Sequence, residues 1–385
     1  MAIILTRKKA EPYRDKHYQA KVIQLQATSH PNQAAGIQVS HCDLSACFAF
    51  FEAHGIYEGL DIAPASGALQ CRMNDAWMQV HVPDSDTLSL HQHAKHLKQE
   101  ILWAMLVSPH RFEFNDLEAL GSAVRVRENI VLDARKTALA FKTNAAERPS
   151  EFWRYEEGAG FILQPHTRLI EALVSATQPE ATGKLYDFSC YRASEYVILL
   201  GLAQEAAQHN PSLLVQLQDV NEKYAIRSGL FHEVFLHEYG SLEAPLPAGF
   251  YVPGDRVWFR NPDERSSDVT GYEGSWVIYV GSGLFSNFWK RDQPFTLQSK
   301  CIEIYHWRDG VKTNAAGDLW MDETIVDACV HETMQDPAKV QHILQQMMRI
   351  RDPKDVYAEG GCVDASRECP KQISPTATEL VLPKF

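Results

Sequence analysis

The spacing of apolar residues along the chain changes from a helical period in the middle to an alternating one after about residue 250. Helical spacing predicts helices over 88–106, from 115 onward, over 167–176, over 190–207 and over 337–350. Apolar runs and alternation between turn residues predict strands at 22–25, 77–82, 256–259, 276–280 and 301–305, with a hairpin at 152–163. Asn115, followed three residues later by Glu118, has the pattern of a helix start.

This order of elements predicts an α+β fold in which a cysteine-bearing helix packs on an antiparallel sheet. The chain has 385 residues, of which 45% are hydrophobic, so it can bury more than one core. We expect an N-terminal accessory region of mixed structure over 1–110, a core domain over 111–310 and a C-terminal extension over 311–385.

Charge and composition exclude several classes of partner. The chain carries 37 Lys and Arg against 49 Asp and Glu, a net charge of -12, which argues against nucleic acid and against a membrane as partner. No segment approaches the ~18 consecutive apolar residues of a membrane span. The N-terminus has the wrong order of charge for a secretory signal. The protein is therefore expected in the cytoplasm, or exported without a cleaved signal peptide.

The residue most suited to chemistry is Cys190, at the predicted start of the helix over 190–207. Free N–H groups and the helix dipole at that position lower a thiol pKa, and the same groups can hold an oxyanion. An ordinary buried cysteine at the start of a core helix is the alternative. None of the eight cysteines has C-x-x-C spacing, so no metal is expected.

Four segments carry a resemblance to a known family: F-W-R at 152–154, L-Y-D-F-S-C at 185–190, P-G-D-R-V-W-F-R-N-P at 253–262 and G-S-W-V-I-Y-V-G at 274–281. In order and spacing they resemble the Y-W-R, Y-x-F-E-C-A-T-A, G-D-x-x-Y-F-K-N-P and G-E-N-x-I-x-L-G segments of the spore-coat transglutaminases of bacilli, the protein-glutamine gamma-glutamyltransferases. The third segment is the most specific, because it combines a turn, a strand and a second turn. The resemblance extends over about 112–310.

The resemblance implies a papain-like or transglutaminase-like core, with 111–310 as the catalytic domain and Cys190 as the nucleophile. The implied reaction is a cysteine-dependent acyl transfer from protein glutamine to lysine amines, which cross-links proteins, or to water, which deamidates them. The implied partner is a protein substrate with exposed glutamine and lysine. No metal or organic cofactor is implied.

Three positions depart from the family pattern. Ser189 replaces the Glu before the cysteine, Ser275 replaces a catalytic Glu, and Phe288 stands where an ungapped register places a catalytic His. A base must then come from elsewhere. Glu273 lies two residues before Ser275, on the same face of a strand. His306 follows the strand expected over 301–305, which pairing could bring near Cys190.

Further alternatives remain open. His232 and His237, each beside a glutamate, and Ser275 itself could also assist the thiol, although ordinary structural roles suit all of these residues. At the level of function, the same core could form another cysteine amidase or peptidase. It could also be a catalytically silent relative that binds a partner through its cleft, with 1–110 as a docking module.

Overall fold

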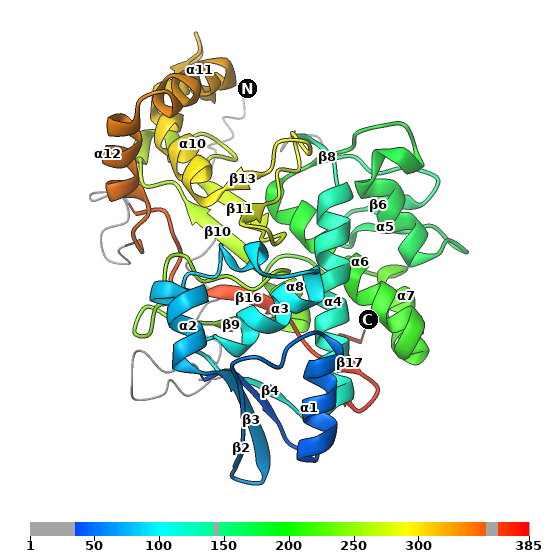
Figure 1. The fold of residues 1–385 in the computed structure, drawn as a ribbon. Coiled ribbons are helices and arrows are strands. Elements are labelled where there is room, and N and C mark those ends of the chain that lie inside the picture. The colour runs from blue at the N-terminus through cyan, green and yellow to red at the C-terminus, as the bar shows by residue number, and fades with distance from the viewer. Residues whose placement is uncertain (1–34, 142–145, 352–360, 385) are drawn as a thin grey trace.

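The computed structural model describes residues 35–141, 146–351 and 361–384, and its centre is a four-stranded antiparallel sheet. The strand order is β11-β10-β16-β9, with bounds Gly274–Ile278, Arg256–Arg260, Arg367–Pro370 and Leu236–Tyr239. The strands expected at 256–259 and 276–280 are confirmed, the second beginning two residues earlier than expected. Figure 1 shows this sheet between two groups of helices.

Alternate side chains along the strands face the two helical layers. Val257 and Val277, paired across β10 and β11, pack in a core with α10 (Leu297–Gly310), α11 (Glu323–Met334) and α12 (Pro337–Met347). Ile278, one residue further along β11, packs instead in the core of the other layer. That layer contains α4 (Leu117–Lys136), α5 (Leu169–Thr177), α6 (Cys190–His209), α7 (Pro211–Asn221) and α8 (Gly229–Phe235).

Helix α6 begins at Cys190, as the apolar pattern predicts, and extends two residues beyond the predicted end. Ser189 has extended backbone angles and its hydroxyl accepts from the Arg192 N–H, so it caps the helix. At Gly201 the helix meets α4 closely: a Cβ there would lie 2.6 Å from the Ile130 side chain. This local capping and close packing place the Cys190 end of α6 against β11.

The N-terminal region forms its own sheet, in the order β2-β3-β1-β4, at the lower end of the molecule in Figure 1. Its elements are β1 (Ile37–Val39), α1 (Leu44–Ala53), β2 (Leu60–Ala65), β3 (Ala68–Met73), α2 (Asp75–His81), α3 (Leu97–Leu106) and β4 (Phe112–Phe114), with 3-10 turns at Pro83–Ser85 and Leu90–Gln92. The strand expected at 22–25 lies outside the described residues.

Two predictions in this region are wrong in type or extent. Residues 77–82 fall largely in helix α2 and not in a strand, because Asn74 caps it by accepting from the Trp77 N–H at 2.9 Å. The helix expected over 88–106 is a 3-10 turn followed by α3, which starts after the capping side chain of His96. The cap of α4 is Asp116, one residue after the predicted Asn115.

The strand predicted at 301–305 is also wrong, because this segment is the middle of helix α10. The alternating isoleucines Ile302 and Ile304 favour a strand, but a reciprocal capping box between Thr296 and Ser299 starts a helix just before them. Leu297, Cys301 and Ile304 then lie at helical spacing and are buried. The helix predicted over 337–350 is confirmed as α12, and the hairpin predicted at 152–163 is confirmed as β6 and β7.

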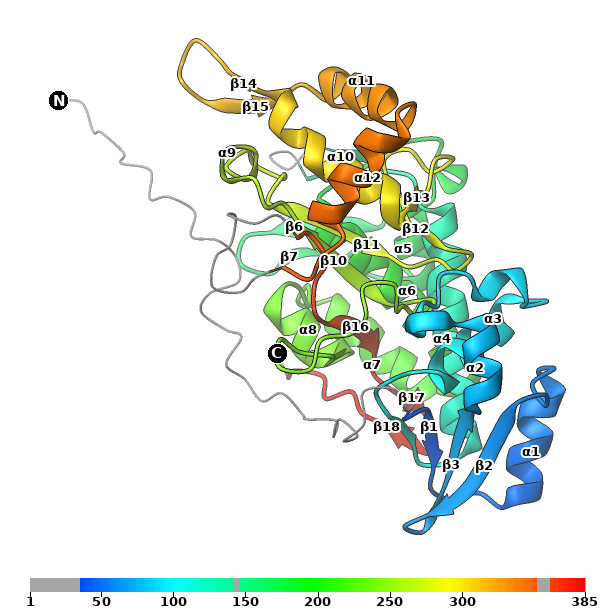
Figure 2. The same ribbon diagram turned by 60° about the vertical axis from the view of Figure 1, so that its left-hand side comes forward.

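The C-terminal segment returns to the middle of the molecule. Its strand β16 lies between β10 and β9, with Arg256 opposite Glu368. The central sheet therefore takes one strand from beyond residue 310, while the proposed boundaries at 110 and 310 stay predictions. The remaining short elements are β5 (Ala140–Phe141), β6 (Trp153–Glu156), β7 (Gly160–Leu163), Pro179–Ala181, β8 (Asp187–Phe188), α9 (Glu264–Ser267), β12 (Leu284–Phe285), β13 (Phe295–Thr296), β14 (Val311–Thr313), β15 (Leu319–Met321), β17 (Ile373–Ser374) and β18 (Ala377–Thr378). Figure 2 shows the β14–β15 hairpin beyond α10 and α11.

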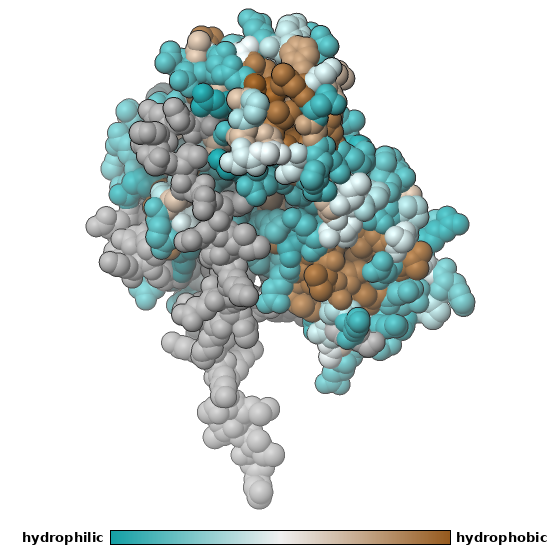
Figure 3. Space-filling model, turned by 90° about the horizontal axis from the view of Figure 1, so that it is seen from below, coloured by the Kyte–Doolittle hydropathy of each residue, from teal (hydrophilic) through white to brown (hydrophobic). Residues whose placement is uncertain are grey.

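Exposed apolar side chains gather in a few places on the surface of the described structure. Seen from below, the molecule has patches of apolar side chains on a mostly hydrophilic surface (Figure 3). One shallow hollow between α1 and β2 is lined by Leu44, Phe48 and Ile62. A lipid bilayer could not be crossed by any helix in the described part of the chain, since each is too short or too polar.

Candidate active site

The thiol of Cys190 lies where the start of α6 meets β11, the outer strand of the central sheet. Its residue is half-buried. Two backbone N–H groups act on the sulfur as hydrogen-bond donors, one from Trp276 on β11 and one from Tyr191, the next residue in α6. A sulfur placed against two N–H groups is suited to carry negative charge, and the same donors suit an oxyanion at the attacked carbon.

The pKa of the Cys190 thiol is raised above its ordinary value, with burial as the main cause. The Trp276 N–H, the Lys300 ammonium and the Tyr191 N–H lower it, whereas the charge of Glu273 raises it. The N–H group at the helix start lowers the thiol pKa, as expected, but the loss of hydration outweighs the N–H groups and the cation, so the net shift is upward. A thiol whose pKa is raised in this way needs a proton acceptor to react as a thiolate.

Arg256 holds together the two residues whose N–H groups face the thiol. Its side chain is fully buried, and its guanidinium lies 5.0 Å from the Tyr191 ring centroid and 4.7 Å from that of Trp276. The two rings are 5.2 Å apart in an edge contact. Glu368 on β16 pairs with Arg256 from the other side. This cluster fixes the position of both N–H donors relative to Cys190.

Lys300 is the charged residue near the thiol that the sequence pattern did not reveal. It lies in the first turn of α10, its side chain is only 4% exposed, and its Nζ donates to Glu303 at 2.8 Å. The ammonium also lies 3.9 Å from the Phe295 ring centroid. The T-L-Q-S capping box at 296–299 could have indicated this helix, but no local signal indicates that its first turn lies near Cys190.

Glu273 is the predicted partner that the structure brings to the thiol, since its charge acts on the Cys190 pKa. It is exposed, immediately before β11. The Gly271 N–H donates to its carboxylate at 3.1 Å, and the Asn261 N–H donates to its carbonyl at 3.1 Å. Glu273 is thus accessible to solvent.

Ser275 occupies the position at which the family has a glutamate. Its side chain lies on the opposite face of β11 from the side chain of Trp276. It pairs with Phe259 and shares a strand face with Val277, and both of these belong to the core beneath α10–α12. Trp276, on the opposite face, contacts Tyr191 beside the nucleophile. The strand geometry therefore directs the Ser275 hydroxyl away from the face that carries Tyr191.

His306 lies on helix α10, so the strand pairing expected to bring it to Cys190 does not exist. Both of its ring nitrogens have partners: Nδ1 is 2.7 Å from the Asp309 carboxylate and Nε2 is 2.8 Å from Thr333 Oγ1 on α11. Lys300 and Glu273, not His306, are the charged residues among those described that act most on the pKa of the Cys190 thiol. Sequence reasoning placed His306 at the wrong site because it assigned the wrong element.

The two other histidines are held by carboxylates. His232 on α8 is 3.0 Å from Glu368, the partner of Arg256, so it belongs to the buried network behind Tyr191. His237 on β9 is 3.0 Å from Glu379 near the end of the chain. Both arrangements support the fold around the site, and neither histidine acts on the thiol as strongly as Lys300 does.

The G-D…N-P segment at 253–262 has a structural role in this molecule. Asp255 is fully buried, accepts from Arg127 on α4 at 2.8 Å and accepts from the Val252 N–H at 2.8 Å. Asn261, at the other end of β10, donates to Ser266 Oγ and to the Tyr272 carbonyl, both at 2.8 Å. The segment thus anchors β10 to the helical layer and shapes the loop that leads to Glu273.

Comparisons with known proteins identify the family of the chain. The family model for protein-glutamine gamma-glutamyltransferase matches residues 78–372. The chain belongs to this transglutaminase family. The match includes Cys190, β10, β11, Lys300 and all of β16, so all groups described around the thiol fall within it.

Individual relatives are distant. The protein-glutamine gamma-glutamyltransferase of Halalkalibacterium halodurans is 23% identical over 199 residues, which is 49% of this chain and 62% of that protein. The enzyme of the same description from Bacillus cereus is 24% identical over 197 residues, 49% of this chain and 64% of that protein. The chain thus spans less than two thirds of the length of these relatives. The solved transglutaminase from Geobacillus stearothermophilus, without its C-terminal extension, aligns with a TM-score of 0.39 at 20% identity, over 56% of this chain and 96% of that chain.

Proposed function

We propose that the protein is a cysteine-dependent acyltransferase that acts on glutamine side chains of protein substrates, with Cys190 as the nucleophile. The observation that carries this proposal is the setting of the thiol: it lies at the start of α6, between the Tyr191 and Trp276 N–H groups and near the buried ammonium of Lys300. Membership in the transglutaminase family supports the choice of glutamine over other acyl donors.

In the acylation step, the Cys190 sulfur attacks the carbon of the glutamine carboxamide. A C–S bond forms, the carbonyl oxygen takes the negative charge, and the Tyr191 and Trp276 N–H groups stabilise that charge. When the tetrahedral intermediate collapses, the C–N bond breaks and ammonia leaves with the proton that the thiol gave up. The product of this half-reaction is a thioester on Cys190.

In the second step, a lysine amine of another protein attacks the thioester carbon. An isopeptide bond forms, the C–S bond breaks, and Cys190 leaves as a thiolate that Lys300 stabilises until it is reprotonated. If water attacks instead, glutamine becomes glutamate. The partner in both cases is a protein with an exposed glutamine, and the cross-linking reaction also needs an exposed lysine.

Glu273 is our candidate for the proton acceptor, because its exposed carboxylate is the one whose charge acts on the Cys190 thiol. A carboxylate beside a neutral thiol can accept the proton as the C–S bond forms, and can return it to the departing ammonia. Lys300 acts in the opposite sense on the thiol pKa and stabilises the thiolate. Together they assist deprotonation without a histidine.

The test is amine incorporation into a glutamine donor. The protein is incubated with a glutamine-containing casein and a labelled primary amine, beside Cys190→Ala and the control Cys42→Ala, whose cysteine lies before α1 in the N-terminal sheet region. We expect labelled product with the unaltered protein and with the control, and none with Cys190→Ala. Cys190-dependent ammonia release without incorporation would indicate a deamidase. No Cys190-dependent product, with no alkylation of that thiol, would overturn the proposal and favour a partner-binding relative.

A further inference from the structure

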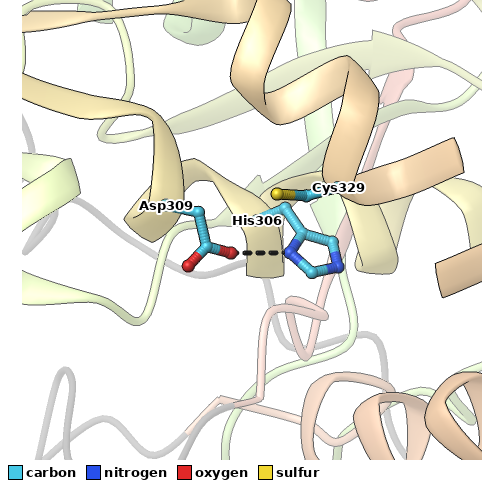
Figure 4. A group of neighbouring side chains, drawn as sticks. All are labelled: His306, Asp309 and Cys329. Atoms are coloured by element: carbon cyan, nitrogen blue, oxygen red, sulfur yellow. Dashed lines mark hydrogen bonds and ion pairs between the residues drawn. The ribbon is translucent and has the colours of Figure 1, made fainter. Parts of the chain in front are cut away.

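A group of side chains that could bind a metal ion lies away from Cys190, in the helical layer formed by α10, α11 and α12. His306 and Asp309 project from α10 and Cys329 projects from α11, and Figure 4 shows the three converging between these helices. One ligand atom from each lies within 4.8 Å of the other two. His306 is buried, Cys329 is half-buried and Asp309 is exposed, so the group opens to solvent on one side.

We propose that His306, Asp309 and Cys329 bind a divalent zinc ion that links α10 to α11. Imidazole nitrogen, carboxylate oxygen and thiolate sulfur are the three ligand types that zinc accepts in proteins, and water can take a fourth position where a site is open. On binding, the Cys329 proton passes to solvent, and the ring proton that His306 donates from Nδ1 to Asp309 moves to Nε2, so that Nδ1 can bond to the metal. The inference is independent of the transfer reaction at Cys190.

The partner of the second ring nitrogen supports a ligand role for His306. Its Nε2 lies 2.8 Å from Thr333 Oγ1, and Thr333 is 3% exposed. In the metal-free structure Nδ1 donates to Asp309 and Nε2 can accept from the Thr333 hydroxyl. When the ring proton moves to Nε2, that nitrogen donates to Thr333 instead, and Nδ1 becomes available to a metal. Metal-bound histidines are oriented by this kind of second hydrogen bond, which also selects the ring tautomer.

The local charge favours a cation. The carboxylates of Asp309 and Glu332 both act on the Cys329 thiol, and Glu332 also interacts with His306. Lys339 pairs with Glu332 on the outer side, at 2.6 Å. Because Lys339 already compensates Glu332, the charges that a divalent ion would neutralise are those of Asp309 and a Cys329 thiolate.

The geometry needs only a small adjustment. With typical zinc bonds of about 2.0–2.3 Å, tetrahedral ligand atoms lie about 3.4–3.6 Å apart. The Nδ1–carboxylate distance of 2.7 Å must therefore widen by under about 1 Å, while Cys329 approaches from within 4.8 Å. Two of the ligands come from one helix at i and i+3, where side chains share a face. The exposed Asp309 is the group best able to move.

The experiment uses Co²⁺ as a spectroscopic probe of the full chain, reduced and freed of metal with a chelator. We expect binding of one Co²⁺ per chain, with a thiolate-to-metal absorption band in the near ultraviolet that added Zn²⁺ removes. Cys329→Ala should abolish the band, Asp309→Asn should weaken binding, and Thr333→Val should weaken it by about 10–100-fold. Cys190→Ala is the matched control, because it removes a thiol at the other site, and it should keep the full spectrum.

Two results would overturn the proposal: no thiolate band in the unaltered protein, or a band that survives in Cys329→Ala. The two most informative substitutions lie at positions that are exposed or half-buried, so the variants should fold, and their far-ultraviolet circular dichroism checks this. Because the readout is a metal spectrum, failure here leaves the proposed acyl transfer untouched. Failure of amine incorporation likewise leaves the metal proposal standing.

Discussion

Two cysteines, one in each helical layer, lie in opposite chemical surroundings. Cys190 faces two backbone N–H groups and the ammonium of Lys300, with the carboxylate of Glu273 further out. Cys329 faces an imidazole and a carboxylate. Donors and cations around a sulfur favour the development of negative charge, which suits a nucleophile. Lone pairs around a sulfur favour a cation, which suits a metal ligand.

The position of a residue along a helix determines which of the two thiols it can interact with. His306 and Lys300 lie on the same helix, yet Lys300 in the first turn acts on Cys190, whereas His306 near the end contacts α11. A histidine in the right part of the sequence is therefore no evidence for a Cys–His pair. The predictions below test whether the two regions are as separate as this comparison requires.

The largest expected effect is a loss of activity that occurs when Cys190 is replaced but not when His306 is replaced. Cys190→Ala should lower amine incorporation by at least about 10³-fold, as loss of a nucleophile does in other enzymes. His306→Gln should lower it far less, because both ring nitrogens are engaged away from Cys190. Initial rates with the same glutamine donor give the measurement. Equal losses in the two variants would mean that His306 belongs to the catalytic site after all.

The next largest expected effect is a loss of stability on replacing Glu368, in the central sheet between the two helical layers. Glu368→Gln leaves the buried Arg256 guanidinium without its counter-charge and should lower the free energy of unfolding by about 3–5 kcal/mol. Burial raises the pKa of Glu368, but Arg256 and His232 outweigh it and lower this pKa from 4.5 to about 2. Its stabilising contribution is therefore present above pH 4.5 and is lost as the pH falls towards 2.

Chemical unfolding of the protein and of Glu368→Gln, measured at neutral and at acid pH, checks this prediction. The variant should differ most from the unaltered protein at neutral pH and least at the acid end. Glu264→Gln, at an exposed position on α9, is the control and should change little. If Glu368→Gln unfolds like the control, the ion pair does not stabilise the sheet between the two helical layers.

Glu273→Gln should have opposite effects on two measurements at Cys190. As the loss of a proton acceptor, it should lower kcat for amine incorporation by about 10²-fold. Because the Glu273 charge raises the thiol pKa, its removal should increase the rate of alkylation by iodoacetamide at neutral pH. Glu264→Gln should change neither rate. A parallel fall in both rates would indicate a damaged site and not a lost base.

The smallest expected effect concerns Lys300. The pKa of the Cys190 thiol is raised by burial, so alkylation of the unaltered protein should keep increasing as the pH rises past 9. Lys300→Met removes a group that lowers this pKa, so its alkylation profile should move to higher pH and its rate at pH 8 should fall by about tenfold or less. Lys312→Met, at an exposed position on β14, should leave the profile unchanged. If the profile of Lys300→Met is not shifted, Lys300 on α10 does not stabilise the Cys190 thiolate.

Sequence reasoning succeeded where local signals agree. The start of α6 at Cys190 and the strands that contain Trp258 and Trp276 follow from apolar spacing and turn residues, all within a few positions. It failed at 301–305, where isoleucine alternation suits a strand but the capping box at Thr296 begins a helix. A short apolar run fits both periods, and the neighbouring cap decides between them.

From the sequence alone it could be predicted that a cysteine stands at the start of a buried helix, within segments that mark the family, because helix starts and turns depend on residues close together in the chain. The packing of distant elements was needed to show that burial raises the pKa of this thiol, that Lys300 and Glu273 act on it, and that His306 lies close to Cys329. Desolvation and Coulomb interactions act through space between packed layers, so their outcome depends on which elements meet.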